Sequence, residues 1–445
     1  MALNNKKNIV LFVGFSIPRS QLDSLRKSPE GKKYRYALMH NISNPTKAQK
    51  ETIDSFDFEL VVNFESPRSI MDSLRPYESE IKAVTCRGEF NIAYFQRVIP
   101  YVPYLRTPTV ESLQWATDKI QMRRRFMSYD RSITPKFKVV KDATKKTVKE
   151  IEDRLSFPVV VKPSGLAASL LVTIAYHPEE LQAALRKVFS KIKRLNKENR
   201  KEKSEPQVLV EQFMEGTMYS VDAFVSSRGK VHFCPMVYVK TGKDVGFDDF
   251  FTYLTMTPTV LSKKSIEDAQ IAATKAIHAL GLRSTSAHIE LFKTEQGWKI
   301  IELGPRLGGF RNTMYDLSFG IDIALNDILI RVPKKPVLRK KIKGYTAVLK
   351  SFAKKEGVIT KIKGIKKVKE LETFYSLKQR HKVGDRVHYA KHGGRAVLEV
   401  TLFDKERKNV LADIRRLEKL VLVETVLTAK KAQAKREERN GKKKK

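Results

Sequence analysis

The sequence predicts an α+β protein that is built from several structural units. In the first hundred residues, short apolar runs alternate with polar, partly helical stretches, which is typical of a parallel sheet with helices on its faces. Residues 284–309 instead contain two alternating apolar runs around a turn, which is typical of an antiparallel hairpin. The chain has 445 residues, and a chain of this length is expected to divide into two to four units.

Composition narrows the class of protein. A hydrophobic content of 41% supports real cores, and no apolar run is long enough to cross a membrane. The apolar run after the basic N-terminal residues is too short for a signal peptide and predicts a first strand. Cys86 and Cys234 are the two cysteines, with no metal-binding spacing. We therefore expect a cytoplasmic protein without membrane contact, disulfide or zinc site.

Positive charge is concentrated near the C-terminus. Residues 331–445 hold 36 Lys and Arg against 12 Asp and Glu, which gives +24 of the net charge of +37. One interpretation is weak contact with nucleic acid or another anionic partner, and the alternative is a solvated basic surface. The last residues, 429–445, have almost nothing apolar to bury, and we predict a disordered tail.

The N-terminal unit is expected to contain four strands. No GxGxxG motif follows the first of them, so a dinucleotide fingerprint is absent. The unit is therefore interpreted as scaffold or as one wall of a substrate site. Its predicted strands are residues 9–15, 36–39, 59–63 and 81–85.

Two segments after this unit carry residues suited to anion binding. Residues 111–127 have helical spacing and predict one helix, in which Lys119 and the arginines 123–125 occupy the basic face. We expect the three arginines to be solvated. Residues 158–161 predict a buried strand that ends at Lys162, and the small residues 164–169 form a loop that would let backbone amides approach an anion.

A strand-end carboxylate marks the next segment. Glu211 ends an apolar run and precedes Phe213 and Met214, which could sandwich an adenine or simply pack in a core. Residues 240–251 are polar, aromatic and glycine-containing, and they could close over a site as a mobile flap.

The hairpin places two acids face to face. A three-residue loop, 295–297, with Gly297 in the left-handed conformation puts Glu290 opposite Glu302. Like charges there destabilise a hairpin, so a cation is expected between them. Mg²⁺, shared with a substrate phosphate, suits two carboxylates in a cleft. The alternative is a hairpin whose acids merely face solvent. The opposite, core-facing set is predicted to be Ile289, Leu291, Ile301 and Leu303.

Other polar residues accompany the hairpin. Arg306 precedes two glycines and could aim its charge at a phosphate. Arg311 could hold a second carboxylate of a substrate, or it could serve packing. In the same register His288 faces Gly304, so its ring could line the metal and phosphate site. The alternative for His288 is a packed strand residue, with water near Gly304.

Four motifs in this order carry a family resemblance: VVVKPSG, LVEQFMEG with YSVD, HIELF, and IIELGPRLGG. They resemble the ATP-grasp superfamily, most closely its carboxylate–amine ligases of the amino-acid (dipeptide) type. The resemblance implies an ATP-grasp fold between a flavodoxin-like or Rossmann-like α/β unit and a β-rich unit. The implied domains are an N-terminal unit at 1–110, two ATP-grasp subdomains at 111–206 and 207–332, and a basic C-terminal unit at 333–428.

The resemblance also implies roles for single residues. Lys119 and Lys162 match lysines that hold the ATP phosphates, and Lys162 and Arg306 are the implied catalytic residues. Glu290 and Glu302 match the ligands of Mg²⁺ or Mn²⁺, whereas Gly304 stands where many relatives have a ligating Asn. The implied phosphate-covering loop contains Ser164, Gly165 and Ser169, and the implied adenine-binding segment is Glu211, Gln212 and Phe213.

The activity implied by the resemblance is an ATP-dependent, ADP-forming ligase. It would join a small carboxylic acid to an amine, expected to be an amino acid by analogy with the family, through an acyl phosphate, and would act as a homodimer. Two alternatives are an ATP-dependent carboxylase or carbamoyl-phosphate-type enzyme, and a nucleotide-binding protein with a nucleic-acid-binding tail.

Overall fold

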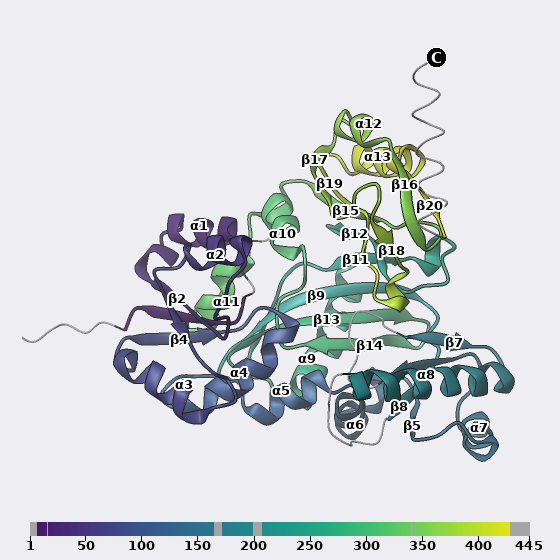
Figure 1. Cartoon of the computed structure of the whole chain (residues 1–445), viewed down its shortest axis with the longest axis horizontal. Helices are drawn as coiled ribbons and strands as arrows, with labels where there is room; N and C mark the ends of the chain where they lie inside the picture. Colours follow the sequence, from purple (N-terminus) through teal and green to yellow (C-terminus); the bar gives the residue numbers. More distant parts are fainter. Residues whose placement is uncertain (1–6, 16, 164–170, 199–206, 340, 428–445) are drawn as a thin grey trace, which may run out of the picture.

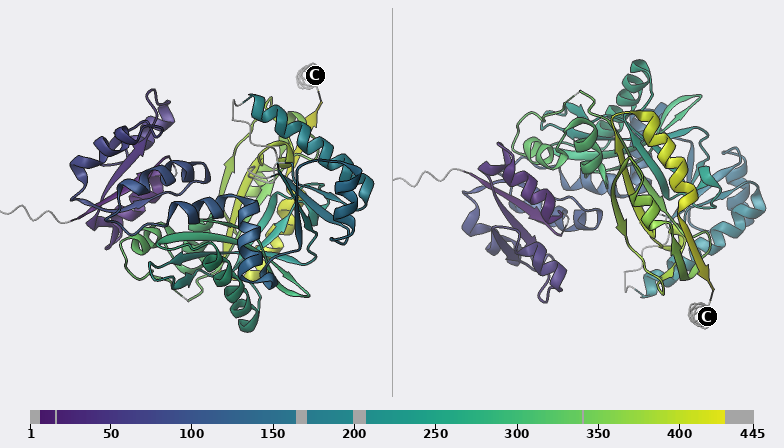
Figure 2. Two further views of the ribbon diagram at one scale, coloured as in Figure 1. Left: turned by 90° about the horizontal axis from the view of Figure 1, so that it is seen from below. Right: turned by 90° about the horizontal axis from the view of Figure 1, so that it is seen from above.

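The structure is a computed structural model of the whole chain, and it describes residues 7–15, 17–163, 171–198, 207–339 and 341–427. The described strands form four sheets. Figures 1 and 2 show the N-terminal unit at one end of the molecule and the C-terminal strands beside the large central sheet. The predicted loop at 164–169 and the predicted tail at 429–445 lie outside the described residues.

The N-terminal sheet is parallel, as the alternation of strands and helices predicted. Its order is β3-β2-β1-β4, and its inner strand β1 is apolar and buried throughout because helices cover both faces. A helix from much later in the chain, α11, covers one of these faces through Ala324 and Ile328. The elements are β1 (Ile9–Val13), β2 (Arg35–His40), β3 (Phe58–Val61), β4 (Ile81–Thr85), α1 (Arg19–Lys27), α2 (Lys47–Ile53), α3 (Pro67–Leu74), α4 (Ile92–Val98) and α11 (Ile323–Arg331).

Residues 111–127 form two helices, so the prediction of one helix is wrong. Asp118 has extended backbone angles, φ −101° and ψ 109°, and its carboxylate accepts hydrogen bonds from the N–H groups of Ile120 and Gln121. An aspartate that caps a helix in this way ends the preceding one. The two helices are α5 (Val110–Thr117) and α6 (Lys119–Tyr129). The break places Lys119 at a helix start.

A small antiparallel sheet follows, in the order β5-β8-β6-β7. Two amphipathic helices pack on it and bury a separate core. No helix in the described ranges, the long helix α8 included, is both long and apolar enough to cross a membrane. The elements are β5 (Phe137–Val140), β6 (Val159–Pro163), β7 (Thr173–Ala175), β8 (Val208–Gln212), α7 (Lys145–Glu152) and α8 (Pro178–Glu198).

The largest sheet has the order β14-β13-β9-β11-β12-β15-β19-β17, with β10 beside β9. The alanine-rich face of α9 packs against β9, β13 and β14 together with α6, and α10 packs on a different core. The elements in this part are β9 (Thr217–Val225), β10 (Val231–Phe233), β11 (Val237–Thr241), β12 (Thr252–Thr257), β13 (Thr285–Thr294), β14 (Gly297–Gly304), α9 (Lys263–Ala279) and α10 (Arg311–Phe319).

Three C-terminal strands extend this central sheet, because β15 pairs with β12 and continues into β19 and β17. A further three-stranded sheet, β18-β16-β20, lies beside them, and α13 packs on β15 and β19. Part of the C-terminal segment thus shares a sheet with the hairpin. The elements are β15 (Tyr345–Ser351), β16 (Gly357–Lys363), β17 (Phe374–Gln379), β18 (Arg386–Val387), β19 (Leu398–Asp404), β20 (Leu422–Val426), α12 (Ile365–Lys369) and α13 (Arg407–Leu420).

Candidate active site

The hairpin of β13 and β14 brings Glu290 directly opposite Glu302, which confirms the predicted pairing. The predicted three-residue loop is wrong, because Thr294 pairs with Gly297 across a two-residue turn. A bulge between Glu290 and Leu291 shifts the register by one residue and compensates for the shorter turn. The acids therefore face each other as predicted, although the turn differs.

The bulge also changes the role of Ile301. Ile301 was predicted to face the core, but Ile300 is the fully buried residue and Ile301 is only partly buried. Ile301 instead lines a cavity, and its carbonyl oxygen accepts a hydrogen bond of 2.6 Å from Arg123 Nη2. A bulge frees a residue from its ladder position in this way.

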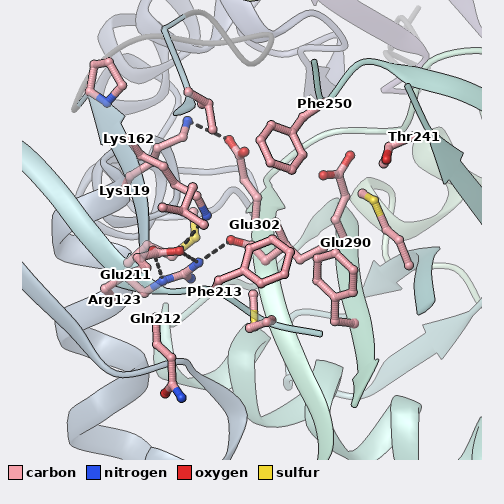
Figure 3. A pocket seen from close by; sticks show the side chains of 18 residues that line it. Lys119, Arg123, Lys162, Glu211, Gln212, Phe213, Thr241, Phe250, Glu290 and Glu302 are labelled. Carbon is pink, nitrogen blue, oxygen red and sulfur yellow. Dashed lines mark hydrogen bonds and ion pairs between the residues drawn. The ribbon is translucent and has the colours of Figure 1, made fainter. Parts of the chain in front are cut away.

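A cavity of about 130 Å³ lies between this hairpin and the small sheet. In Figure 3 the Glu302 side chain lies between the two lysines on one side and Glu290 on the other. Lys119 Nζ donates a hydrogen bond of 3.0 Å to Glu302 Oε1. The cavity is lined by the predicted residues Lys119, Lys162, Glu211, Gln212, Phe213, Glu290 and Glu302.

Arg123, Glu211 and Lys162 form a buried ion network in one wall of this cavity. Arg123 Nε lies 2.5 Å from Glu211 Oε1, and Lys162 Nζ lies 2.5 Å from Glu211 Oε2. The side chains of Arg123 and Glu211 are 2% and 1% exposed, so the prediction that Arg123 is solvated is wrong. A buried carboxylate needs such compensation, and Arg123 supplies it from α6.

The network shifts two pKa values. Burial alone would raise the pKa of Glu211, but the charges of Arg123 and Lys162 outweigh it and hold the pKa at about 2. Burial lowers the pKa of Lys162, and the charge of Glu211 opposes this effect only in part. Glu211 is therefore a permanent anion in the wall.

The segment after Glu211 is held by its backbone. The N–H groups of Gln212 and Phe213 donate hydrogen bonds of 3.0 Å to the carbonyl oxygens of Lys136 and Pro158. Phe213 lines the cavity, and so do Met218 and Phe250. The cavity thus has apolar side chains near the carboxylate wall. Ser164, Gly165 and Ser169, the predicted phosphate loop, lie outside the described residues.

A second cavity, of about 510 Å³, adjoins the first. Met218, Phe250, Glu290 and Glu302 line both cavities, so the opposed acids lie where the two meet. Phe250 belongs to the predicted flap, 240–251. A ligand that reaches from one cavity into the other must pass the two acids.

Arg306 lines the second cavity and is bound by the N-terminal unit. Its Nε atom lies 2.5 Å from Glu89 Oε2, and Nη1 donates a hydrogen bond of 3.0 Å to the carbonyl of Leu307. Glu89 also lines this cavity. The N-terminal unit therefore contributes a charged side chain to the site, in agreement with its interpretation as a wall.

His288 lies in the second cavity and faces Gly304, as its register predicted. Its Nδ1 lies 3.2 Å from Asp222 Oδ1, and its Nε2 lies 3.7 Å from Glu290 Oε1. A Cβ atom at Gly308 would approach His288 Nδ1 to 2.5 Å. Glycine at that position therefore leaves room for the ring.

The buried carboxylate of Asp222 is contacted by several hydrogen-bond donors. It accepts hydrogen bonds from the Gly308 N–H and the Tyr315 hydroxyl. Burial would raise the pKa of Asp222, but His288 and Arg311 outweigh it, and the pKa is lowered. Arg311 is 5% exposed and donates a hydrogen bond of 2.7 Å to Ser220 Oγ. The structure thus places Arg311 in the buried network, which agrees with the packing alternative.

The opposed acids fit a metal that is shared with a ligand. Within the described residues, no group of three or more His, Cys, Asp or Glu side chains is arranged to hold a metal ion. Mg²⁺ is usually bound through one or two carboxylates, with substrate phosphates and water completing its octahedral shell. Glu290 and Glu302 provide such a pair, and Mn²⁺ accepts the same ligands.

Comparisons with known proteins agree with this geometry. The ATP-grasp domain family matches residues 155–314, which include Lys162, Glu211 and the hairpin. The crystal structure of an L-amino acid ligase from Bacillus licheniformis superposes with a TM-score of 0.70 at 18% identity, covering 95% of this chain and 99% of that chain. The chain carries an ATP-grasp domain. The predicted ATP-grasp resemblance and α+β fold are confirmed.

Other known proteins are similar to this chain in structure or in sequence. An N5-carboxyaminoimidazole ribonucleotide synthetase from Thermus thermophilus superposes with a TM-score of 0.66 at 16% identity, covering 93% of this chain and 98% of that chain. The alanine–anticapsin ligase of Bacillus amyloliquefaciens is 26% identical over 310 residues, or 61% of this chain. The match spans 62% of the length of that relative.

Sequence reasoning missed two groups around the ATP-grasp domain. The first is Arg123, whose signal was its position four residues after Lys119, on the same side of a helix. The second comes from β15, β19 and the residue after β17, which add Lys350, Glu399 and Arg380 to the second cavity. Nothing in the sequence pattern marked that contribution, because it depends on long-range strand pairing.

Proposed function

We propose that the protein is an ATP-dependent, ADP-forming ligase that joins a carboxylic acid to an amine. The observation that carries the proposal is the position of Glu290 and Glu302, opposed on the hairpin at the junction of two cavities. One cavity would hold the nucleotide and the other the two remaining substrates. The names of the relatives, an alanine–anticapsin ligase and an L-amino acid ligase, support a ligase activity.

The first cavity suits ATP. We assign the segment of Glu211, Gln212 and Phe213 to the adenine, with Phe213 and Met218 as apolar neighbours. Lys119 and Lys162 would bind the phosphates as compact positive charges on flexible stems. Because Lys119 donates to Glu302, it would exchange this carboxylate for phosphate oxygens when the nucleotide enters.

The opposed acids would hold Mg²⁺ or Mn²⁺ together with the phosphates of ATP. When bound, such an ion neutralises phosphate charge and polarises the phosphoryl group. Glu290 and Glu302 hold the site together from two strands of one hairpin. His288 lies against Glu290 and would orient that carboxylate, as hydrogen-bonded neighbours of metal ligands do.

The proposed chemistry has two steps. A carboxylate oxygen of the acid attacks the γ-phosphorus of ATP, and ADP leaves, which gives an acyl phosphate. The amine then attacks the acyl carbon, phosphate leaves, and the nitrogen loses a proton. Arg306 would neutralise the negative charge that develops on the acyl group in both steps. Closure of residues 240–251 over the site would keep water from the acyl phosphate.

A pairwise screen tests this function. Purified protein is mixed with ATP, Mg²⁺ and pairs of amino acids, and ADP release and product mass are measured. We expect ADP, phosphate and a condensed product for at least one pair. AMP with pyrophosphate would contradict the mechanism, and ADP release that needs bicarbonate but no amine would favour the carboxylase alternative.

Lys162→Met is the matched test of the nucleotide cavity. It should abolish ATP-dependent turnover while the fold persists, because Lys162 ends a strand and contacts a carboxylate rather than the core. Lys138→Met is the control, since Lys138 lies on the edge strand β5, pairs with Glu150 of α7 and does not line the cavity. Wild-type activity in Lys162→Met would show that this lysine is peripheral.

A further inference from the structure

The second cavity has a group of charged residues that the proposed chemistry does not use. This group, here called the C-terminal wall, consists of Lys350, Arg380, Arg395 and Glu399. Lys350 lies on β15 and Glu399 on β19, and the two residues are direct partners across the strands. Both strands belong to the part of the central sheet beyond β12, whereas Arg380 directly follows β17 and Arg395 precedes β19.

One cation of the C-terminal wall is fully paired. Arg380 donates two hydrogen bonds to Glu399, from Nε to Oε1 at 2.7 Å and from Nη2 to Oε2 at 2.9 Å. The Glu399 residue is 7% exposed. A bidentate pair of this kind uses both carboxylate oxygens, so Glu399 has little capacity left for a second cation.

Lys350 lies beside this pair without joining it. Its Nζ lies 4.8 Å from the centre of the Phe310 ring, and within the described part of the chain it makes no hydrogen bond or ion pair. Burial lowers the pKa of Lys350 to about 8, although the charge of Glu399 opposes this effect. A partly buried ammonium group that lacks a carboxylate is costly, and a ligand would remove that cost.

The charges that line the whole second cavity also favour an anionic ligand. Arg306 is paired with Glu89 and Arg380 with Glu399, and the proposed function assigns Glu290 and Glu302 to a metal. Lys350 and the exposed Arg395 remain, and neither has an ion pair among the described residues. Once Glu290 and Glu302 are assigned to the metal, two of the four Lys and Arg residues in the lining are left without a carboxylate.

We propose that Lys350 and Arg395 bind a second carboxylate of the substrates, one that the reaction does not consume. This inference rests on the proposed function, because the carboxylate that is activated must lie at the junction beside Glu290 and Glu302. A cationic subsite elsewhere in the same cavity then needs a different anionic group. Its sources are the carboxylate of an amino acid that acts as the amine, or a second carboxylate on the acid.

Chemical modification tests the subsite without turnover. The full chain, with Mg²⁺ and a non-hydrolysable ATP analogue, is acetylated at pH 8 in the presence of neutral L-amino acids or of their α-amides. Mass spectrometry gives the modification rate of Lys350 relative to Lys378 in the same sample. Lys378 is the matched control, because it lies opposite Glu399 in the register of β17, the other neighbouring strand, and its side chain is exposed.

We expect the amino acids to lower the relative rate at Lys350 at least about threefold compared with the amides, since a bound carboxylate favours the charged amine. If amino acids and amides give equal relative rates, glutarate and its monoamide are compared in the same way, which tests a second carboxylate on the acid. Equal relative rates in both comparisons would contradict the proposal that Lys350 and Arg395 bind a carboxylate.

Kinetics of Lys350→Met identify the source of the carboxylate. We expect KM for the substrate that supplies it to rise about tenfold or more, the loss of one charge-assisted contact, with KM for its amide and for ATP unchanged. Lys378→Met should behave as wild type. An equal change for acid and amide would indicate a structural role and overturn the assignment. Absence of ADP release in the wild type would contradict the proposed function alone, since the acetylation result is independent of turnover.

Discussion

The two cavities that meet at Glu290 and Glu302 differ in how their charges are compensated. In the wall of the first, Glu211 is bound by Arg123 and Lys162 at 2.5 Å each, and all three charges are satisfied within the protein. In the second, Lys350 and Arg395 remain without a carboxylate among the described residues. The wall on the small four-stranded sheet is thus electrostatically complete, whereas the wall beside the large central sheet is not.

The difference separates two uses of buried charge. A closed network such as that of Glu211 holds its groups in fixed positions, and breaking it leaves a buried charge uncompensated. Cations without partners instead give a ligand a favourable contact that the protein does not already make. We infer that the first wall provides a rigid surface for a ligand, whereas the second depends on its ligand for charge balance.

Glu290→Gln tests the junction between the two cavities and has the largest expected effect. Loss of one of two metal-binding carboxylates should lower kcat for ADP release at least about thousandfold. Because the variant also removes a like-charge pair across the strands, stability should stay equal or rise by up to about 1 kcal/mol. ADP release and urea unfolding measure the two quantities.

Glu295→Gln is the matched control for this prediction, because Glu295 lies in the turn of the same hairpin. It should leave both quantities unchanged. Near-normal turnover in Glu290→Gln would contradict the assignment of the junction, and a large loss of stability would show that the carboxylate serves the fold.

The hairpin indicates how much of the site the sequence could predict. The pairing of Glu290 with Glu302 was predicted from the alternation of apolar residues and an expected three-residue loop. The pairing is correct only because a bulge compensates for the shorter turn. Alternation gives the face on which a side chain lies, but a bulge depends on tertiary contacts. One of these is the Arg123 contact to the Ile301 carbonyl, which joins residues 178 positions apart. The four parallel N-terminal strands needed only local patterns and were predicted correctly.

Glu211→Ala tests the complete wall. The variant leaves Arg123 and Lys162 buried without their carboxylate, and we expect a loss of about 3 kcal/mol in the free energy of unfolding, measured with urea at pH 7. Glu150→Ala is the control, because Glu150 pairs with Lys138 at the surface, where such pairs contribute less than about 1 kcal/mol. Equal losses in the two variants would mean that the network contributes no more than a surface pair.

The same network predicts a dependence on pH. The pKa of Glu211 falls from an ordinary 4.5 to about 2 in the folded protein. Between these values the unfolded chain binds the proton and the folded chain does not, so lowering the pH favours unfolding. The stability difference between the wild type and Glu211→Gln should therefore be largest above pH 4.5 and shrink toward pH 2. A constant difference would contradict the shift.

The burial of Arg123 in this wall could not be predicted from the sequence. A run of three arginines on a helix is usually a solvated face, and two of the three, Arg124 and Arg125, do lie at least partly exposed. Arg123 is buried because α6 packs against the strand that carries Glu211, an arrangement between residues 88 positions apart. The helical period could place Arg123 near Lys119, but only the fold could supply the carboxylate.

His288→Ala tests the junction from its second-cavity side and has the smallest expected effect. The ring lies 3.7 Å from Glu290 Oε1 and is held by Asp222, so its loss should loosen one proposed metal ligand without removing it. Asp222 keeps its hydrogen bonds from Gly308 and Tyr315, and the fold should persist. We expect the magnesium concentration for half-maximal turnover to rise about threefold to tenfold, less than the effect of removing a ligand.

Two further measurements distinguish a role of His288 in orienting Glu290 from a general disturbance of the site. Mn²⁺ affinity, followed by electron paramagnetic resonance with a non-hydrolysable ATP analogue, should weaken by the same factor in His288→Ala and recover in His288→Asn, which restores a polar group beside Glu290. His278→Ala is the control, because the His278 ring contacts the Gly229 carbonyl outside both cavities. If His288→Ala leaves the magnesium requirement and the Mn²⁺ affinity unaltered, water fills the space opposite Gly304 and the imidazole is only a packed strand residue. A fall in turnover at every magnesium concentration, with Mn²⁺ affinity unchanged, would instead indicate that His288 contacts the substrates and does not orient Glu290.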